Sequence, residues 1–157
     1  PAKGQIAIFN RSHYEDIIAV RVKKIFPDPV WKRRYKHVLD FEAMLAEEGT
    51  VIIKLFLNIS KAEQKKRLES RLQDPDKLWK FCMDDLDDRN RWDEFQTAYQ
   101  DLIEKTSTPE APWYIIPADR KWYRNLVVAR LMVEKLRHLQ LSLPTPNFDP
   151  ASIIIPD

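Results

Sequence analysis

Three short apolar runs, separated by stretches with helical spacing, constrain the fold of this 157-residue chain more than any other feature. They cover residues 6–9, 51–57 and 113–116. Near-continuous apolar runs are typical of parallel strands that are covered on both faces. Because helical patterns lie between them, the order of elements favours a doubly wound domain. The sequence therefore predicts an α/β fold built on a parallel sheet.

Local signals mark where several of the helices begin and end. One helix follows Ser12, and a second begins near Pro29 and ends at Gly49, a plausible C-terminal cap. A third begins after Ser60, and Glu63 three residues later completes a capping box. The remaining helices are expected over residues 76–83, 84–105 and 119–141.

Composition limits the class of protein and the kind of ligand. The chain is 44% hydrophobic and 32% charged, and no apolar run approaches the roughly 20 residues of a membrane span. The single cysteine, Cys82, excludes an internal disulfide framework, and we expect a soluble cytoplasmic protein. The net charge is only +2, so attraction to an anionic substrate must come from local clustering of basic residues.

The first candidate site follows the first apolar run, at Asn10, Arg11 and Ser12. Ligands of open α/β sheets bind outside the carboxyl ends of the strands, so a polar triplet with an arginine there is a candidate phosphate site. Glu15 and Asp16 follow as candidate metal ligands. Alternatively, Asn10 and Ser12 only cap the next helix, and the two acids only favour its N-terminus.

A second basic cluster lies on the helices between residues 65 and 91. Arg67 and Arg71 are four residues apart and share one helix face, and Lys80 and Arg89 follow. A hinged helical pair that carries cations on its inner face is suited to close over phosphates. The alternative is an ordinary solvated face. The aromatic residues of this region, among them Trp79 and Trp92, are expected to be packing anchors.

The third candidate site, residues 117–124, follows the third apolar run. Asp119 and Lys121 stand there at a strand-end position that suits a ligand. Asp119 is equally plausible as the N-cap of the last helix.

Five stretches together resemble the family-2 polyphosphate kinases, in order over about residues 4–140: IFNRSHYED, WKRRYKHVLDFE, KLFLNISKAEQKKRL, DPDKLWKFCMDDLDDRNRWDEF and APWYIIPADRKWYRNL. The resemblance implies a three-layer P-loop kinase fold similar to thymidylate kinase, with a helical lid at about residues 74–92. It also implies magnesium and the transfer of a terminal phosphate between inorganic polyphosphate and nucleotides. Asn10 stands where most members carry aspartate, which resembles the third class, whose members take AMP through ADP to ATP.

The resemblance also implies a role for each candidate residue. The catalytic residues would be Arg11, Arg67, Lys80 and Arg89, and the Mg²⁺ ligands Glu15 and Asp16. Nucleotide and phosphate binding would fall to Asn10, Ser12, Arg71, Asp119 and Lys121. The expected partners are inorganic polyphosphate with AMP, ADP or ATP, and a second copy in a homodimer or homotetramer, but neither nucleic acid nor a membrane.

One part of the family pattern has no counterpart. With only Gly4 and Gly49, no glycine-rich phosphate loop can be written, and we expect that loop upstream of Pro1. We therefore expect residues 1–141 to be the C-terminal portion of a kinase domain with an incomplete sheet, inactive by itself. The proline-rich tail, residues 142–157, is expected to wrap the domain or dock on a neighbouring subunit. The alternative functions are an ATP-dependent nucleoside monophosphate kinase and a non-catalytic module for polyanion binding or oligomerisation.

Overall fold

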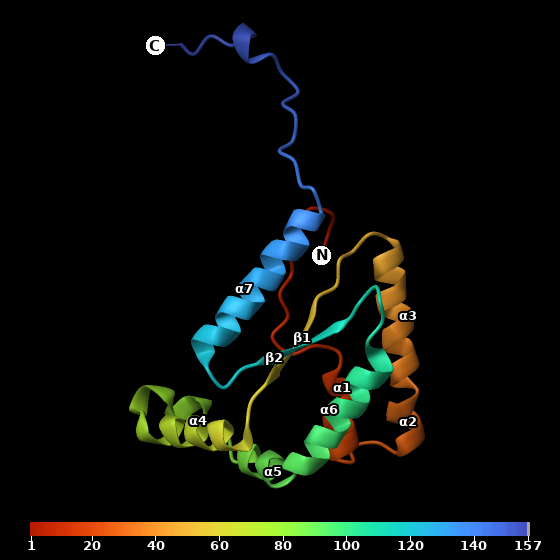
Figure 1. Cartoon of the computed structure of the whole chain (residues 1–157), viewed down its shortest axis with the longest axis vertical. Helices are drawn as coiled ribbons and strands as arrows, with labels where there is room; N and C mark the ends of the chain where they lie inside the picture. Colours follow the sequence, from red (N-terminus) through yellow and green to blue (C-terminus); the bar gives the residue numbers. More distant parts are fainter. Residues whose placement is uncertain (157) are drawn as a thin grey trace.

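The structure is a computed structural model that describes residues 1–156. Figure 1 shows the strands at the centre, helices on both sides of them and a C-terminal tail that leaves the body. The strands are β1 (Lys54–Asn58) and β2 (Trp113–Pro117). The helices are α1 (Glu15–Val22), α2 (Asp28–Lys32), α3 (Arg34–Glu47), α4 (Lys61–Gln73), α5 (Asp84–Asn90), α6 (Trp92–Thr106) and α7 (Lys121–His138), with 3₁₀ turns η1 (Pro75–Lys80) and η2 (Pro150–Ser152).

The two strands pair in parallel, as the apolar runs predict. Lys54 lies opposite Trp113, and Asn58 lies opposite Pro117, so both carboxyl ends reach the same edge of the sheet. The backbone N–H of Ala118 continues the pairing by donating to the Asn58 carbonyl at 2.8 Å. The predicted α/β fold with a parallel sheet is therefore confirmed.

The strand predicted over residues 6–9 is wrong. This segment is coil, and Ile6, Ile8 and Phe9 are 67%, 83% and 76% exposed. A strand requires a hydrogen-bonded neighbour, and within residues 1–156 the sheet has only two strands, β1 and β2. An apolar run alone is not sufficient to make one.

Two of the predicted helices are each divided in two. The helix expected from Pro29 is α2 followed by α3, separated by the single residue Arg33. The helix expected over residues 84–105 is α5 followed by α6, separated by Arg91. The backbone of Arg91 leaves the helical region (φ −97°, ψ 25°) and marks the boundary between α5 and α6, and its guanidinium donates to the Val22 carbonyl at 3.0 Å.

The apolar core lies on one side of the sheet, where α1, α3 and α6 pack against one another (Figure 1). Arg21 of α1 donates to Asp101 of α6 at 2.6 Å and fixes these two helices. On the other side, α7 packs against β2. The buried members of the main cluster are Tyr14, Ile17, Ile18, Val20, Val22, Trp31, Val38, Ala98 and Leu102.

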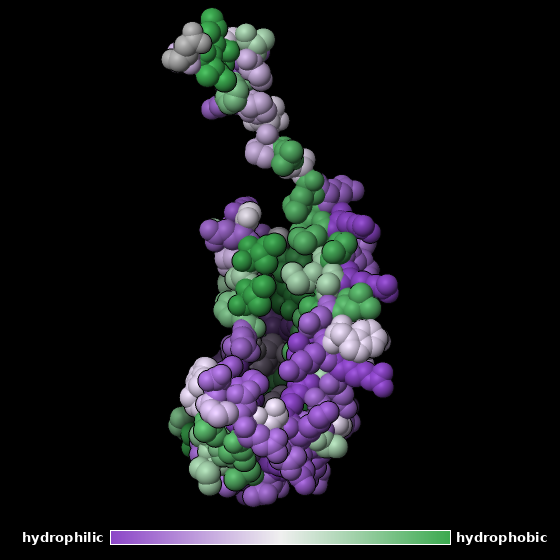
Figure 2. All heavy atoms as spheres, turned by 90° about the vertical axis from the view of Figure 1, so that its left-hand side faces the viewer, coloured by the Kyte–Doolittle hydropathy of each residue, from purple (hydrophilic) through white to green (hydrophobic). Residues whose placement is uncertain are grey.

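The tail does not wrap the domain, so that half of the expectation is wrong, whereas docking on a neighbouring subunit stays a prediction. Residues 142–156 are exposed throughout and extend away from the end of α7 (Figure 1). Asp157, the last residue of the predicted tail, lies outside the described residues. In Figure 2, apolar side chains gather on the body beneath the tail, whereas the lower part of this face is mainly hydrophilic. None of the helices within residues 1–156 is both long and apolar enough to cross a bilayer.

Candidate functional site

A hollow of about 450 Å³ lies at the carboxyl ends of β1 and β2. This is the edge of a parallel sheet where ligands bind in open α/β folds. Polar groups from two chain segments meet an aromatic ring there. The residues that line the hollow include Asn58, Ser60, Lys61, Trp92, Pro117 and Asp119.

Asp119 joins the two strand ends. Its Oδ1 accepts the backbone N–H of Ser60 at 2.7 Å, and Ser60 Oγ accepts the N–H of Glu63 at 3.1 Å, the predicted cap of α4. The backbone N–H of Ser60, then its side chain and then the charge of Arg67 lower the pKa of Asp119. The last helix, α7, has Arg120 at its N-cap without a side-chain cap. The alternative in which Asp119 caps α7 is therefore wrong, because its carboxylate serves α4.

Arg67 braces α4 against the end of β2. Its Nε donates to Glu63 Oε1 at 2.8 Å. Its Nη2 donates to the carbonyls of Ala118 at 2.7 Å and Asp119 at 3.3 Å. The guanidinium thus contacts the backbone of Ala118 and Asp119, two residues that line the hollow, and Glu63 compensates part of its charge.

Arg89 of α5 reaches the first turn of α4. Its Nη1 donates to the Lys61 carbonyl at 2.7 Å and to Gln64 Oε1 at 2.9 Å. Both acceptors are neutral, so the positive charge is not compensated by them. Within residues 1–156, the Nε and Nη2 edge has no hydrogen-bond partner. A planar edge of this kind matches two phosphate oxygens.

The other two cations of the predicted lid lie at the far end of α4. Arg71 Nη1 donates to the Lys80 carbonyl at 3.4 Å and to Asp85 Oδ2 at 3.2 Å. Lys80 Nζ lies 5.0 Å from the ring centroid of Trp79. Trp79 is 78% exposed, so it is not the packing anchor that its sequence context suggests. Trp92, by contrast, lines the hollow and is half-buried.

The predicted phosphate triplet forms a turn before α1. Arg11 adopts a left-handed backbone conformation (φ 72°), and its Nε lies 3.3 Å from Glu15 Oε1. Ser12 Oγ accepts the N–H of Tyr14 at 3.4 Å. Ser12 therefore does support the start of the helix, while the side chain of Arg11 is 79% exposed and accessible to a ligand.

The donors for a metal ion are of the right kind but incomplete. Asn10, Glu15 and Asp16 offer oxygen atoms, which Mg²⁺ prefers, but Glu15 is already paired with Arg11. Nowhere in residues 1–156 do three or more His, Cys, Asp or Glu side chains gather as a metal site. Because Mg²⁺ is commonly bound by one or two carboxylates together with substrate phosphates, these residues fit a partial set.

The structure brings some of the predicted residues together and leaves others apart. Asp119 lines the hollow, Arg67 and Arg89 bond to the carbonyls of lining residues Ala118 and Lys61, and Arg71 contacts Lys80 farther along α4. The turn at Asn10–Ser12 precedes α1 and lies near Tyr99 of α6, whose pKa is raised first by burial and then by the charge of Glu15. Lys121 is exposed at the start of α7 and lines no part of the hollow.

Several residues that line the hollow were not predicted as site residues from the sequence, among them Asn58, Lys61 and Trp92. Asn58 and Lys61 flank the end of β1, and the signal that could have found them is their place directly after an apolar run. Trp92 carries no such signal, because it comes from α6 by tertiary packing.

Residues 1–143 match the sequence model of one protein family, Polyphosphate kinase 2 (PPK2). The chain belongs to the polyphosphate kinase 2 family. Its α/β architecture agrees with a solved member, a polyphosphate kinase 2 from Arthrobacter aurescens TC1, at a TM-score of 0.92 and 47% identity. That alignment covers 97% of this chain and 54% of the solved chain.

Curated relatives in the polyphosphate kinase 2 family carry names that specify substrates. An AMP/ADP-polyphosphate phosphotransferase of Meiothermus ruber is 53% identical over 155 residues, which is 99% of this chain and 58% of the relative. An ADP-polyphosphate phosphotransferase of Rhodopseudomonas palustris is 37% identical over 92% of this chain and 54% of the relative. The chain therefore spans somewhat more than half the length of these relatives.

Proposed function

We propose that this protein transfers phosphoryl groups from inorganic polyphosphate to nucleoside mono- and diphosphates, taking AMP through ADP to ATP. The observation that carries the proposal is Arg89, held at the first turn of α4 by neutral acceptors, with the Nε and Nη2 edge bonded to no protein group in residues 1–156. The name of the Meiothermus ruber relative, with its AMP and ADP acceptors, supports the substrate class.

The cations divide into two groups that a chain of phosphates would bridge. Arg67 and Arg89 bond to backbone carbonyls of residues that line the hollow, and Lys80 lies on η1, which contacts the far end of α4. Arg11 is presented from the turn before α1. Phosphoryl transfer depends mostly on positioned positive charge, since charge spreads over the phosphoryl oxygens in the transition state. We assign these four residues to catalysis, and the binding of phosphates and nucleotide to Asn10, Ser12, Arg71, Asp119 and Lys121.

Glu15 and Asp16 would hold Mg²⁺ together with Asn10 and the substrate phosphates. A bound magnesium ion neutralises part of the phosphate charge. Arg11 pairs with Glu15, so the same carboxylate serves both the cation of the turn and the metal. The carboxylate of Glu15 thereby also orients the guanidinium of Arg11 towards the first turn of α1.

The family fold supports two further proposals. The domain is a three-layer P-loop kinase fold with residues 74–92 as its lid, and it assembles as a homodimer or homotetramer. Because the chain spans 58% of the Meiothermus ruber relative, the activity requires a polypeptide longer than residues 1–157. The chain alone is then inactive, since no glycine-rich phosphate loop can be written in it.

The test uses the full natural polypeptide with AMP, Mg²⁺ and polyphosphate, without ATP. We expect ADP first and ATP later, and absence of both products would contradict the proposal. Product formation from ATP and AMP alone would instead favour the nucleoside monophosphate kinase.

Two variants on neighbouring helices connect the activity to the site. Arg89→Ala should lower kcat/KM by about a hundredfold, as expected when a donor to developing charge is lost. Lys65→Ala, which removes an exposed lysine of α4 paired with Glu69, should stay within about twofold of wild type. If Arg89→Ala weakened polyphosphate binding but left turnover unchanged, the non-catalytic polyanion-binding module would be favoured.

A further inference from the structure

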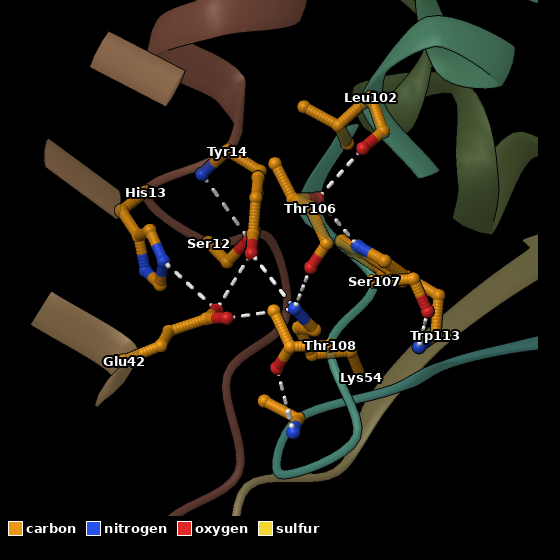
Figure 3. Close-up of polar contacts among 11 residues, drawn as sticks. Ser12, His13, Tyr14, Glu42, Lys54, Leu102, Thr106, Ser107, Thr108 and Trp113 are labelled. Atoms are coloured by element: carbon orange, nitrogen blue, oxygen red, sulfur yellow. Dashed lines mark hydrogen bonds and ion pairs between the residues drawn. The ribbon is translucent and has the colours of Figure 1, made fainter. Parts of the chain in front are cut away.

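A buried polar cluster joins four elements beneath the turn at Asn10–Ser12 (Figure 3). Tyr14 at the start of α1, Glu42 of α3, Lys54 of β1 and Thr106 at the end of α6 are 4%, 4%, 6% and 0% exposed. No residue of the cluster belongs to the phosphate site described above. Figure 3 shows their polar atoms pointing at one another.

Every polar hydrogen at the centre of the cluster has an acceptor. Lys54 Nζ donates to Glu42 Oε2 at 2.7 Å, to the Thr106 carbonyl at 2.6 Å and to the Tyr14 hydroxyl at 3.0 Å. An ammonium group has three hydrogens, so its capacity is used completely. The Tyr14 hydroxyl donates in turn to Glu42 Oε1 at 2.7 Å. The hydroxyl therefore has one position that satisfies both neighbours.

Because the cluster is buried, moving the Tyr14 hydroxyl out of this position is unfavourable. Burial lowers the pKa of Lys54, and burial together with the hydrogen bond to Glu42 raises the pKa of Tyr14. In a site of low dielectric, a fully satisfied network strengthens each of its hydrogen bonds, and an unpaired member is unfavourable. The ring of His13 stacks on that of Tyr14 with centroids 4.7 Å apart and restricts it further.

Tyr14 is also joined to the turn that precedes it. Its N–H donates to Ser12 Oγ at 3.4 Å, and the Ser12 carbonyl accepts the N–H of Glu15 at 3.0 Å. Arg11 holds a left-handed conformation (φ 72°) that a non-glycine residue adopts rarely. Such a conformation persists where the surrounding structure determines it. The buried hydroxyl of Tyr14, two residues after Ser12, holds the turn and so supplies that surrounding structure.

We propose that Tyr14 is a positioning residue, whose buried hydroxyl fixes the Asn10–Ser12 turn and the left-handed Arg11 in the geometry that receives the phosphate chain. The inference rests on the proposed function for its last step, because it takes Arg11 as a phosphate contact. Its first step, fixation of the turn, depends on the cluster alone.

The experiment compares Tyr14→Phe with Tyr35→Phe in the full natural polypeptide. Tyr35 packs against the same core, and its buried hydroxyl has no hydrogen-bond partner within residues 1–156. Each variant removes one buried tyrosine hydroxyl, but only Tyr14→Phe removes hydrogen bonds. The two readouts are amide hydrogen exchange at residues 10–18 and kcat/KM for polyphosphate.

Tyr14→Phe should raise exchange at the N–H groups of Glu15 and Asp16 about tenfold, the factor that corresponds to a lost hydrogen bond of about 1.4 kcal/mol. Exchange in the paired strands β1 and β2 should stay unchanged, which a general loss of stability would not allow. In Tyr14→Phe, the fold increase in KM for polyphosphate should be about ten times larger than the fold decrease in kcat. Tyr35→Phe should match wild type in both hydrogen exchange and kinetics.

Equal exchange at residues 10–18 in the two variants would overturn the inference. A normal KM for polyphosphate in Tyr14→Phe, with activity lost in Arg11→Ala, would also overturn the inference. In that case the proposed function would stand, and Tyr14 would have no part in it. If the wild-type polypeptide made no product from polyphosphate, the proposed function would fail. The exchange comparison would still decide whether Tyr14 fixes the turn.

Discussion

Replacing Lys54 with methionine should be among the most destabilising single changes in this chain. The change leaves Glu42, 4% exposed, without the ammonium that lies 2.7 Å from its Oε2. Removal of one partner from a buried pair costs about 3–5 kcal/mol, since a carboxylate remains desolvated without a counter-charge. Domains of this size are commonly stable by about 5–15 kcal/mol, so a large share of the free energy of unfolding would be lost.

A triple variant separates charge from packing. Lys54→Met with Glu42→Leu and Tyr14→Phe leaves no buried charge and no unpaired hydroxyl. Apolar replacement of a whole buried network is often neutral, so the triple variant should recover most of the loss. A deficit of about 1 kcal/mol should remain, because the Thr106 carbonyl loses its bond from Lys54 at 2.6 Å in both variants.

The assay is urea unfolding of the full natural polypeptide, followed by far-ultraviolet circular dichroism. Lys36→Met is the matched control, since Lys36 pairs with Asp40 at 2.6 Å but the two side chains are 76% and 59% exposed. It should change the free energy of unfolding by less than about 1 kcal/mol. The reasoning is refuted if Lys54→Met costs no more than this control, or if the triple variant is no more stable than the single one.

Three further predictions concern stability. Hydrogen bonds from Arg21 and Lys105 lower the pKa of Asp101, so the contribution of the Asp101 carboxylate to stability is complete above about pH 4 and is lost as pH falls through the lowered pKa. Asp101→Asn should therefore make the free energy of unfolding fall less steeply in an acid titration, and an unchanged slope would contradict this. Ser60→Ala should lower the free energy of unfolding by about 1 kcal/mol because Ser60 Oγ caps α4 at 3.1 Å, whereas Ser70→Ala on the exposed face of the same helix should cost nothing measurable. Deleting residues 143–157 should leave the melting temperature within about 2 °C, since residues 143–156 are exposed throughout; a larger shift, dependent on protein concentration, would show that the tail docks on a second copy.

Features with a local cause were predictable from the sequence. Ser60 caps α4 as the spacing to Glu63 indicates, because a side-chain oxygen and an N–H three residues away need no distant partner. Gly49 ends α3 with φ +84°, a conformation that glycine adopts without strain. The second and third apolar runs became β1 and β2 because each supplies the hydrogen-bonded neighbour of the other.

Features with a non-local cause were not predictable. The run at residues 6–9 has the composition of a strand, but pairing depends on a neighbour that composition does not reveal. Glu42 and Lys54 are charged residues of kinds that are mostly exposed, and only the meeting of α3 with β1 explains their burial. Asp119 Oδ1 accepts the backbone N–H of Ser60, the N-cap of α4, 59 residues earlier in the chain, which no spacing rule anticipates.

The anchoring of Arg89 through Nη1 has a consequence for the choice of side chain. An arginine loses up to about 2 kcal/mol of rotamer entropy when it is immobilised, and here much of that loss has occurred before any phosphate arrives. A lysine at this position has its donors on a single nitrogen, so it cannot hold the Lys61 carbonyl and still offer a flat pair of N–H groups. Arg89→Lys should therefore behave as a mobile point charge and not as a conservative replacement.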